Sequence, residues 1–414
     1  MIYTKDSYDR LLESLFARHP SVQDHGFTAG AYKPGLAGML QFDAALGHPS
    51  RQFRSVHVAG TNGKGSVSSM LASALAAGGR RVGLYTSPHL TDFRERIKLV
   101  EDGGPSMIPR EEVFRFLTEQ ELGGLSFFEI TTGMAFWWFA RQQVDVAVIE
   151  VGLGGRLDST NILTPELAVV TSIGLDHCAL LGSTRGAIAA EKAGIFKPGV
   201  PALCGVRDEE TAPVFEARAA AAPCPLFFAE DFDTPDLALD LEGPCQAENL
   251  RTACAALELL GAGPEDPAVR DALARTAART GLRGRWERLC SDPEVICDIG
   301  HNPPALEINF RRLRESGRPL LIVYGIMADK DLDAIRPMMP PDAQYFLVAP
   351  RGERALPAEV LGERMQGLRH TVCKSVEDGV RQALDAAKRT PGCILYIGGS
   401  NFVVAEAIGW FEPD

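Results

Sequence analysis

The run Val56-His57-Val58-Ala59-Gly60-Thr61-Asn62-Gly63-Lys64-Gly65-Ser66 decides the fold of this chain. A short apolar stretch ends in a glycine-rich turn that carries one lysine, and a helical pattern rich in Ala, Leu and Ser follows. In such a unit the backbone N–H groups converge on phosphate oxygens, Lys64 adds a positive charge, and the Ser66 hydroxyl is a candidate Mg²⁺ ligand. The run therefore predicts a phosphate-binding loop between a strand and a helix.

The spacing of this loop differs from the usual nucleotide-binding motif. There, Ser or Thr follows the lysine directly, whereas here Gly65 intervenes and Gly60 lies four residues before Lys64. The alternative is an ordinary glycine-rich turn. The strand pattern before the loop and the helical pattern after it favour the phosphate loop.

Length and composition indicate a two-domain globular enzyme. The 414 residues exceed the usual size of a single core, and the 45% hydrophobic and 23% charged residues are ordinary for a soluble protein. A formal net charge of −12 argues against a broad surface for nucleic acid. Bound anions must therefore be held locally, by loops, lysines and metal.

The cysteines and the N-terminal residues indicate where the protein works. None of the nine cysteines forms a CxxC pair or a Cys/His metal spacing, which favours scattered buried thiols in a reducing compartment. Charged residues interrupt the apolar ones between Met1 and Arg18, so a signal-peptide core is lacking. No stretch approaches the roughly 20 apolar residues of a membrane-spanning helix. We expect a cytoplasmic monomer with small-molecule substrates, and no nucleic-acid or membrane partner.

An alternation of strand and helix patterns predicts the architecture of the first domain. The predicted strand Val144–Val151 is apolar on both faces, which is typical of a parallel sheet covered by helices. The candidate strands are Ser55–Ala59, Arg81–Thr86, Val144–Val151 and Leu167–Ile173, and the candidate helices are Tyr8–Phe16, Gly65–Ala77, Arg110–Gln120 and Glu129–Arg141.

A second alternation follows the Gly/Arg-rich stretch 281–285 and predicts a smaller doubly wound, Rossmann-like domain. We therefore expect domains at 1–282 and 283–414, with this stretch as a hinge and the site in a cleft between them. The candidate strands are Val295–Asp298, Leu320–Tyr324, Tyr345–Ala349 and Cys393–Tyr396, separated by helices at Pro303–Arg314, Ala358–Met365 and Val376–Lys388.

Polar residues follow the ends of the predicted strands, where open α/β sheets place their ligands. Ser87 follows the second strand, Glu150 ends the third, and His177 follows the fourth. Their hydroxyl, carboxylate and imidazole are a candidate ligand set for Mg²⁺ bound to a nucleotide. Taken singly, each also has a structural explanation as a turn cap, a surface ion pair or a satisfied loop histidine.

The loop Gly152–Asn161 follows Glu150 directly and is rich in glycine. Such a loop lets the backbone approach a flat ligand, and Asp158 is a candidate partner for the donor edge of an aminopyrimidine-type ring. The alternative is a structural turn.

Lys192 lies near the end of a helical pattern, Thr184–Ala193, with Gly194 as a C-cap signal. From the residues alone it is a solvated cation that complements the helix dipole.

Six runs of this sequence together resemble one known family. They are Ala59–Ser66, Tyr85–Leu90, Glu150–Asn161, Asp176–His177, Glu191–Ile195 and Asp298–Pro303. In this order they resemble the folylpolyglutamate synthase and dihydrofolate synthase branch of the Mur ligase superfamily. The resemblance covers nearly the whole chain, and it implies an α/β fold of two domains. These are an N-terminal P-loop ATPase-type parallel sheet flanked by helices, which binds ATP, and a smaller C-terminal glutamate-ligase domain.

The resemblance also implies roles for individual residues. Lys64, Lys192 and His301 would be catalytic, with His301 near the incoming glutamate. Lys192 matches a carbamylated lysine, whose added carboxylate would steady a second Mg²⁺. The implied nucleotide-binding residues are Thr61, Asn62, Gly63, Lys64, Gly65, Ser66, Asn249, Arg285 and Asp298, and the implied Mg²⁺ ligands are Ser66, Ser87, Glu150 and His177.

Two further segments match contacts of the pterin moiety. Phe128 would be a stacking ring and Asp158 a hydrogen-bond partner, and the loop Gly26–Gly38 takes the place of a mobile folate-contacting loop. The implied substrate contacts are Ser126, Phe127, Phe128, Glu129, Leu157, Asp158 and Ser159.

The activity implied by the resemblance is ATP-dependent ligation of L-glutamate to 7,8-dihydropteroate, and to folates, through an acyl phosphate. The run Gly155–Asp158 resembles bifunctional bacterial members more than those that only extend glutamate chains. Two alternatives stay open. A Mur-superfamily ligase acting on a cell-wall precursor is disfavoured because too few residues precede the phosphate loop for a nucleotide-sugar domain. A non-catalytic ATP-binding protein is disfavoured because it would not need a second-metal site, which Lys192, Glu150 and His177 together indicate.

Overall fold

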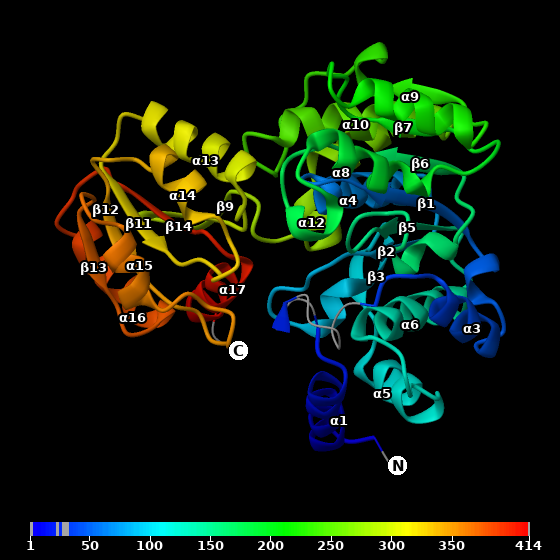
Figure 1. The fold of residues 1–414 in the computed structure, drawn as a ribbon, viewed down its shortest axis with the longest axis horizontal. Coiled ribbons are helices and arrows are strands. Elements are labelled where there is room, and N and C mark those ends of the chain that lie inside the picture. Colours follow the sequence, from blue (N-terminus) through cyan, green and yellow to red (C-terminus); the bar gives the residue numbers. More distant parts are fainter. Residues whose placement is uncertain (1–2, 22–24, 27–32, 413–414) are drawn as a thin grey trace. The chain divides into compact units, whose positions relative to one another are not determined.

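The computed structural model describes residues 3–21, 25–26 and 33–412, and it divides the chain into two units (Figure 1). The first unit comprises residues 1–240 and 246–282, and the second comprises 241–245 and 283–414. Residues 27–32 of the predicted folate-contacting loop lie outside the described residues.

The first unit is built on an eight-stranded sheet of order β4-β3-β2-β5-β1-β6-β7-β8, and the six strands from β2 to β8 in that order run parallel. At one edge β3 runs antiparallel to β2 and pairs with β4 in an antiparallel hairpin, which the sequence did not predict. The strands are β1 (Arg54–Ala59), β2 (Val82–Tyr85), β3 (Ile97–Glu101), β4 (Gly104–Met107), β5 (Val146–Glu150), β6 (Leu167–Val170), β7 (Ala202–Cys204) and β8 (Leu226–Phe228).

Helices cover the faces of this sheet, as the sequence predicted (Figure 1). The helices of the first unit are α1 (Lys5–Arg18), α3 (Ala37–Ala45), α4 (Lys64–Ala77), α5 (Arg110–Glu119), α6 (Phe127–Arg141), α7 (Cys178–Leu181), α8 (Arg185–Lys192), α9 (Ala212–Ala221), α10 (Gln246–Leu259), α11 (Pro267–Ala274) and α12 (Thr276–Thr280). Short 3₁₀ turns occur at η1 (Pro49–Arg51), η2 (Phe93–Arg96), η3 (Ser159–Ile162), η4 (Ala193–Ile195) and η5 (Ala229–Asp231).

Helix α4, which follows the phosphate loop, is buried on all sides. It packs against β1, β2 and β5 and also against α10, α11 and α12, and every residue from Gly65 to Ala76 is buried. A helix without a polar face is typical of such a position between two layers. The small Ala and Ser side chains of α4 allow this close packing on both sides.

The opposite face of the sheet carries two apolar clusters. One joins Tyr85 of β2 and Ile149 of β5 to the aromatic side chains of α6, such as Phe136. The other joins Ala59 of β1 and the strands β6 and β7 to α8, α9 and η4, with Phe215 at its centre. The carboxyl ends of the central strands are therefore held rigidly on both faces.

The second unit is a six-stranded sheet of order β13-β12-β11-β14-β10-β9, in which only β9 runs antiparallel to its neighbour among the described strands. Phe310 of the first helix packs against Tyr324 and Tyr396 on one face, and Gly379 of α16 contacts Val323 on the other. The elements are β9 (Glu287–Ser291), β10 (Glu294–Asp298), α13 (Pro303–Glu315), β11 (Leu320–Tyr324), α14 (Leu332–Ile335), η6 (Arg336–Met338), β12 (Gln344–Leu347), α15 (Ala358–Arg364), β13 (His370–Val372), α16 (Val376–Ala387), β14 (Ile394–Gly398) and α17 (Asn401–Phe411).

Two features of the described residues bear on the sequence analysis. The predicted strand Leu167–Ile173 is too long, because β6 ends at Val170 and the backbone from Thr171 onward bonds to the phosphate loop instead. Within the described ranges, no helix has both the length and the apolar character that crossing a membrane requires.

Phe310→Ala tests the core of the second unit. Phe310 is fully buried, so its truncation leaves a cavity, and we expect the free energy of unfolding to fall by about 3–5 kcal/mol. Urea unfolding combined with hydrogen exchange should place the loss of protection in residues 283–414. Val360→Ala is the matched control, because Val360 is 40% exposed, and an equal loss in that variant would contradict the assignment.

Candidate active site

The candidate site lies where four neighbouring parallel strands end. The strands β2, β5, β1 and β6 are adjacent in this order, and their carboxyl ends lead into the loops 86–90, 152–161, 60–66 and 171–177. Parallel strands end at the same edge of a sheet, so these four loops meet there. The structure thus brings together the regions that the sequence predicted as phosphate, metal and substrate loops.

The phosphate loop is held from behind by the start of the neighbouring loop. The Thr171 hydroxyl donates to the Asn62 carbonyl at 2.6 Å, and the Thr61 N–H donates to the Ser172 carbonyl at 2.7 Å. A Cβ on Gly60 would lie 1.8 Å from Thr171 Oγ1, so only glycine fits there. Gly63 is the N-cap of α4 and supplies no side-chain acceptor, which leaves the first N–H groups of this helix available to an anion.

Two amide side chains of α10 support the other side of the phosphate loop. Asn249 donates to Gln246 Oε1 at 2.9 Å, and Gln246 Nε2 lies 3.4 Å from the Ser66 hydroxyl. A Cβ on Gly63 would lie 2.3 Å from Asn249 Oδ1. The structure therefore places Asn249 against the phosphate loop, and its contact with the nucleotide stays a prediction. Gln246 was missed, because no sequence motif marked it.

Two lysine amines converge on one backbone oxygen in this loop. Lys192 Nζ donates to the Gly60 carbonyl at 2.7 Å, and Lys64 Nζ donates to the same carbonyl at 3.1 Å. Lys192 is only 4% exposed. Burial, with a smaller contribution from the positive charge of Lys64, lowers its pKa to about 7. The interpretation of Lys192 as a solvated helix-end cation, drawn from the residues alone, is therefore wrong.

Two glycines explain why Lys192 is buried. A Cβ on Gly155 would lie 2.7 Å from the Lys192 carbonyl, and a Cβ on Gly194 would lie 2.3 Å from Arg156 Cβ. Because neither position carries a Cβ, the loop 152–161 packs directly on the end of α8. The prediction that Gly194 is a C-cap is wrong, since the chain continues into the η4 turn, and close packing is the reason for this glycine.

The predicted metal ligands occupy three of the strand-end loops. Glu150 Oε2 accepts a hydrogen bond from the Ser87 N–H at 3.0 Å, which brings these two residues together. His177 has a left-handed backbone with φ of 53°, and its N–H donates to Asp176 Oδ1 at 2.9 Å. Among the residues described, no three His, Cys, Asp or Glu side chains form a metal cluster. The predicted set contains only two such side chains, so serine hydroxyls, water and phosphate would complete the shell.

The segment 126–129 begins α6. The Ser126 hydroxyl accepts from the Glu129 N–H at 3.2 Å, and Glu129 Oε2 accepts from the Ser126 N–H at 2.7 Å, which is a capping box. Phe127 is 3% exposed and stacks on Phe16 at 5.4 Å in the core. Phe128 packs on the loop after β5, since a Cβ on Gly152 would lie 2.4 Å from its ring. Phe128 is thus the member of this segment that lies at the loop.

Asp158 organises its own loop. Its Oδ1 accepts from the Thr160 N–H and hydroxyl, at 3.0 and 2.5 Å, and its Oδ2 accepts from the Leu153 N–H at 2.9 Å. Burial raises the pKa of this carboxyl, and the hydrogen bonds from the loop oppose that shift. Ser159 is buried beside it, and the Leu157 carbonyl accepts from the Gly35 N–H at 3.5 Å.

The remaining predicted residues belong to the second unit. Asp298 accepts from the N–H groups of Trp286 and Gly300 at 2.9 and 2.8 Å, and burial raises its pKa. His301 Nδ1 lies 3.0 Å from the Ile299 carbonyl and therefore donates to it. Arg285 donates to the Arg283 carbonyl at 3.3 Å. The assignment of these residues to nucleotide and glutamate stays a prediction.

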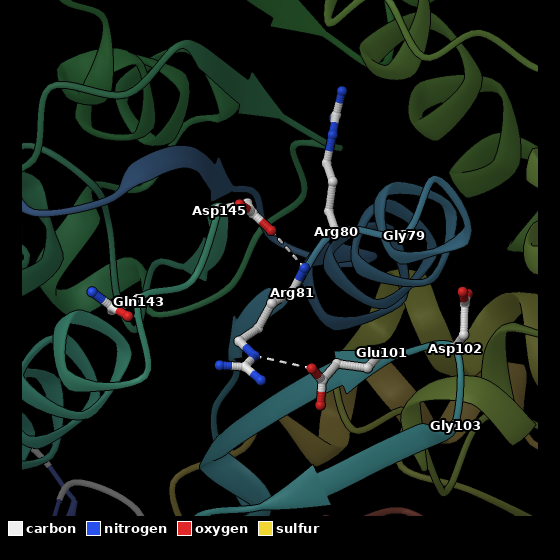
Figure 2. A pocket seen from close by; sticks show the side chains of 8 residues that line it. All are labelled: Gly79, Arg80, Arg81, Glu101, Asp102, Gly103, Gln143 and Asp145. Atoms are coloured by element: carbon white, nitrogen blue, oxygen red, sulfur yellow. Dashed lines mark hydrogen bonds and ion pairs between the residues drawn. The ribbon is translucent and has the colours of Figure 1, made fainter.

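A separate hollow of about 530 Å³ lies at the other end of the strands, where β2 and β5 begin. Figure 2 shows Arg81 there, donating from its backbone to Asp145 and from its guanidinium to Glu101. Because it lies at the amino ends of the strands, this hollow is no part of the candidate site.

A phosphate loop with two converging lysines at the carboxyl edge of a parallel sheet defines a nucleotide-binding α/β protein. Comparison with known proteins narrows this class. Residues 284–401 match the family model described as Mur ligase, glutamate ligase domain. The dihydrofolate synthase/folylpolyglutamate synthase of Bacillus subtilis is 36% identical over 346 residues, covering 74% of this chain and 78% of the relative.

Solved structures agree with this match over almost the full length. Escherichia coli FolC in complex with DHPP and ADP superimposes with a TM-score of 0.81 at 30% identity, covering 98% of this chain and 97% of FolC. A bifunctional folylpolyglutamate synthase/dihydrofolate synthase with Mn, AMPPNP and L-glutamate bound gives a TM-score of 0.82 at 29% identity, covering 97% of each chain. The chain belongs to the folylpolyglutamate synthase and dihydrofolate synthase family.

Gly63→Ala tests the phosphate loop. The new methyl group would collide with Asn249 Oδ1 on a backbone with φ of 84°, so we expect ADP to bind about a hundredfold more weakly, by calorimetry. Gly199→Ala is the matched control, because Gly199 has a φ of 73° but nothing within contact distance. Unchanged ADP affinity in Gly63→Ala would contradict the role of this loop.

Proposed function

We propose that this protein ligates L-glutamate to 7,8-dihydropteroate, and to folates, at the expense of ATP. The observation that carries the proposal is the convergence of Lys64 and Lys192 on the Gly60 carbonyl, at the N-terminus of α4. Two further observations support the same activity. The chain belongs to the family, and two related structures were solved with DHPP and ADP, and with Mn, AMPPNP and L-glutamate. The ATP-binding role falls to residues 1–282 and the glutamate-ligase role to residues 283–414.

The charge at the phosphate loop favours a polyanion. Burial is the main reason why the pKa of Lys192 falls, and repulsion between the two neighbouring ammonium groups adds to it. The triphosphate of ATP relieves this repulsion and also accepts hydrogen bonds from the N–H groups of the loop from Gly63 to Ser66. ATP therefore fits this loop better than a neutral ligand would.

The donor set at the strand ends suits a hard divalent cation. Ser66, Ser87, Glu150 and His177 would hold Mg²⁺, which would neutralise charge on the transferring phosphoryl oxygens when bound. Carboxylation of Lys192 would convert a second cation beside Lys64 into an anion and would supply oxygen ligands for a second Mg²⁺. The neutral amine that this reaction needs is accessible near neutral pH, because the pKa of Lys192 is about 7.

The reaction proceeds in two steps. A carboxylate oxygen of the acceptor attacks the γ-phosphorus of ATP, ADP leaves, and an acyl phosphate forms. The amino nitrogen of glutamate then attacks the acyl carbon, phosphate leaves, and the nitrogen loses a proton. Lys64 and the N–H groups of the loop stabilise the charge that develops on the phosphoryl oxygens.

The remaining assignments follow the family resemblance. Phe128 and the segment 157–159 would contact the pterin ring, since the segment belongs to the loop after β5 and Phe128 packs on that loop. Asn249, Arg285 and Asp298 would contact the nucleotide, and His301 the incoming glutamate. The monomeric state and the cytoplasmic location stay predictions.

Lys64→Ala tests the chemistry. The variant loses the amine that meets the phosphates, so we expect ligation to fall by about a hundredfold or more while the fold persists. Phosphate release from ATP is measured with Mg²⁺ and L-glutamate, with dihydropteroate or tetrahydrofolate as acceptor, and products are confirmed by mass. Lys388→Ala is the control, because Lys388 is an exposed lysine whose amine lies 3.0 Å from Asp385 in the second unit.

The acceptor that works decides the particular activity. Turnover with dihydropteroate alone indicates a dedicated dihydrofolate synthase, and turnover with both acceptors indicates a bifunctional enzyme. Turnover with neither acceptor, or normal turnover by Lys64→Ala, would contradict the proposal.

The pH dependence of carboxylation tests Lys192. Only the neutral amine adds CO₂, forming a carbamate and releasing one proton. With a pKa of about 7, the amine is protonated and unreactive at lower pH, so the carbamate should form at about pH 8 and vanish at about pH 6. The carbamate carbon is detected by nuclear magnetic resonance after addition of isotope-labelled bicarbonate. Lys192→Arg should abolish the signal and Lys197→Arg should keep it, and a signal that survives Lys192→Arg would place the carbamate elsewhere.

A further inference from the structure

His57 is a fully buried polar side chain that the proposed reaction does not use. It lies in the middle of β1, paired with Ile149 of β5 on one side and Ala168 of β6 on the other. Both neighbours are apolar and belong to the clusters on that face of the sheet. A histidine is costly at such a position unless it makes a hydrogen bond that matters.

His57 begins a chain of hydrogen bonds into the loop 152–161. Its Nε2 lies 2.8 Å from Thr160 Oγ1, and Thr160 Oγ1 lies 2.5 Å from Asp158 Oδ1. Asp158 in turn accepts from the N–H groups of Thr160 and Leu153, at 3.0 and 2.9 Å. One continuous path therefore joins the central strand to the turn that shapes the loop.

The direction of this chain follows from counting protons. The Thr160 hydroxyl has a single proton, and its short contact with the carboxylate of Asp158 assigns the proton to that bond. Thr160 Oγ1 must then accept from His57, so His57 carries its proton on Nε2. Its Nδ1 is buried and has no partner among the described residues, as expected for the bare nitrogen of this tautomer.

The surroundings keep His57 neutral. Burial, with a smaller contribution from the positive charge of Lys197, lowers its pKa to about 3. Lys197 itself donates to the Asn161 carbonyl at 3.0 Å, at the end of the same loop. His57 therefore remains a neutral donor throughout the physiological range of pH.

We propose that His57 is a positioning residue, whose donation through Thr160 to Asp158 holds the loop 152–161 in the conformation that receives the acceptor substrate. The proposal rests on the proposed function for the identity of that acceptor. The chain ends on a carboxylate, so each bond strengthens the next. Because β1 is rigid, the hydrogen bond from His57 to Thr160 fixes the position of the loop relative to the sheet.

The contacts of the loop show what would be disturbed without this chain. The same loop packs on the Lys192 carbonyl through Gly155 and on the Phe128 ring through Gly152. If His57 is lost, the Thr160 hydroxyl still donates to Asp158, but it is no longer tied to β1. If the Thr160 hydroxyl is lost, Asp158 is held by backbone N–H groups alone. We expect the loop to loosen and the acceptor to bind less well, while the phosphate loop stays intact.

Paired variants break the chain from either end. His57→Leu and Thr160→Val remove one polar group each, whereas His57→Gln keeps a donor and Thr160→Ser keeps the hydroxyl. Thr132→Val is the matched control, because Thr132 is equally buried and its hydroxyl lies 3.1 Å from the Tyr85 hydroxyl rather than in this chain of hydrogen bonds. If His57→Leu fails to fold, Thr160→Val breaks the same chain with a side chain of nearly equal volume.

Two measurements decide the proposal. We expect His57→Leu and Thr160→Val to raise KM for dihydropteroate about tenfold with KM for ATP nearly unchanged, and the double variant to be no worse than either single one. Hydrogen exchange of residues 152–161, measured without substrates, should quicken in both, and His57→Gln and Thr160→Ser should restore it.

Normal exchange and normal KM in both broken variants, or the same changes in Thr132→Val, would overturn the proposal. If the wild-type protein does not use dihydropteroate, the proposed function fails instead, and the exchange measurement still decides whether His57 holds the loop.

Discussion

The convergence of two buried lysines on the Gly60 carbonyl is the interaction on which the site depends. Placing two ammonium groups at one oxygen is electrostatically unfavourable, and burial together with this repulsion lowers the pKa of Lys192 to about 7. The arrangement becomes favourable when an anion joins it. The chain has a formal net charge of −12, yet it places two lysine amines side by side at the phosphate loop.

Close backbone packing makes this arrangement possible. Gly155 and Gly194 let the loop after β5 press against the end of α8, which drives the Lys192 side chain inward toward Gly60. Gly60 in turn admits the Thr171 hydroxyl at a distance that no other residue would allow. The phosphate loop, the neighbouring strand-end loops and α8 are therefore one packed assembly, and a change in any of them reaches the others.

The fold was largely predictable because its signals are local. Apolar strands with short spacings and helical periodicity placed β1, β11 and α13 within about one residue of their observed limits. The hairpin β3–β4 was missed because a parallel alternation was assumed. The predicted strand Leu167–Ile173 is too long because Thr171 and Ile173 are β-branched, whereas the structure uses Thr171 to support the phosphate loop.

The site was predictable in part. Strand-end positions indicated that Ser87 and Glu150 would come together, and they do. The capping box of Ser126 and Glu129 has a sequence signature, S-x-x-E, from which the start of α6 is predictable. Gln246 had no signal, because a glutamine on a helix is ordinary until its partner is known.

The sequence by itself determined the strand–loop–helix unit, the two successive α/β alternations and the family, since each depends on the order of nearby residues. Only the tertiary structure decided that Lys192 is buried and that His57 reaches Thr160. Those contacts join residues more than a hundred positions apart, as for His57 and Thr160 or Lys192 and Gly60. Burial and hydrogen bonding across such a distance depend on which strands lie side by side, and no local pattern carries that information.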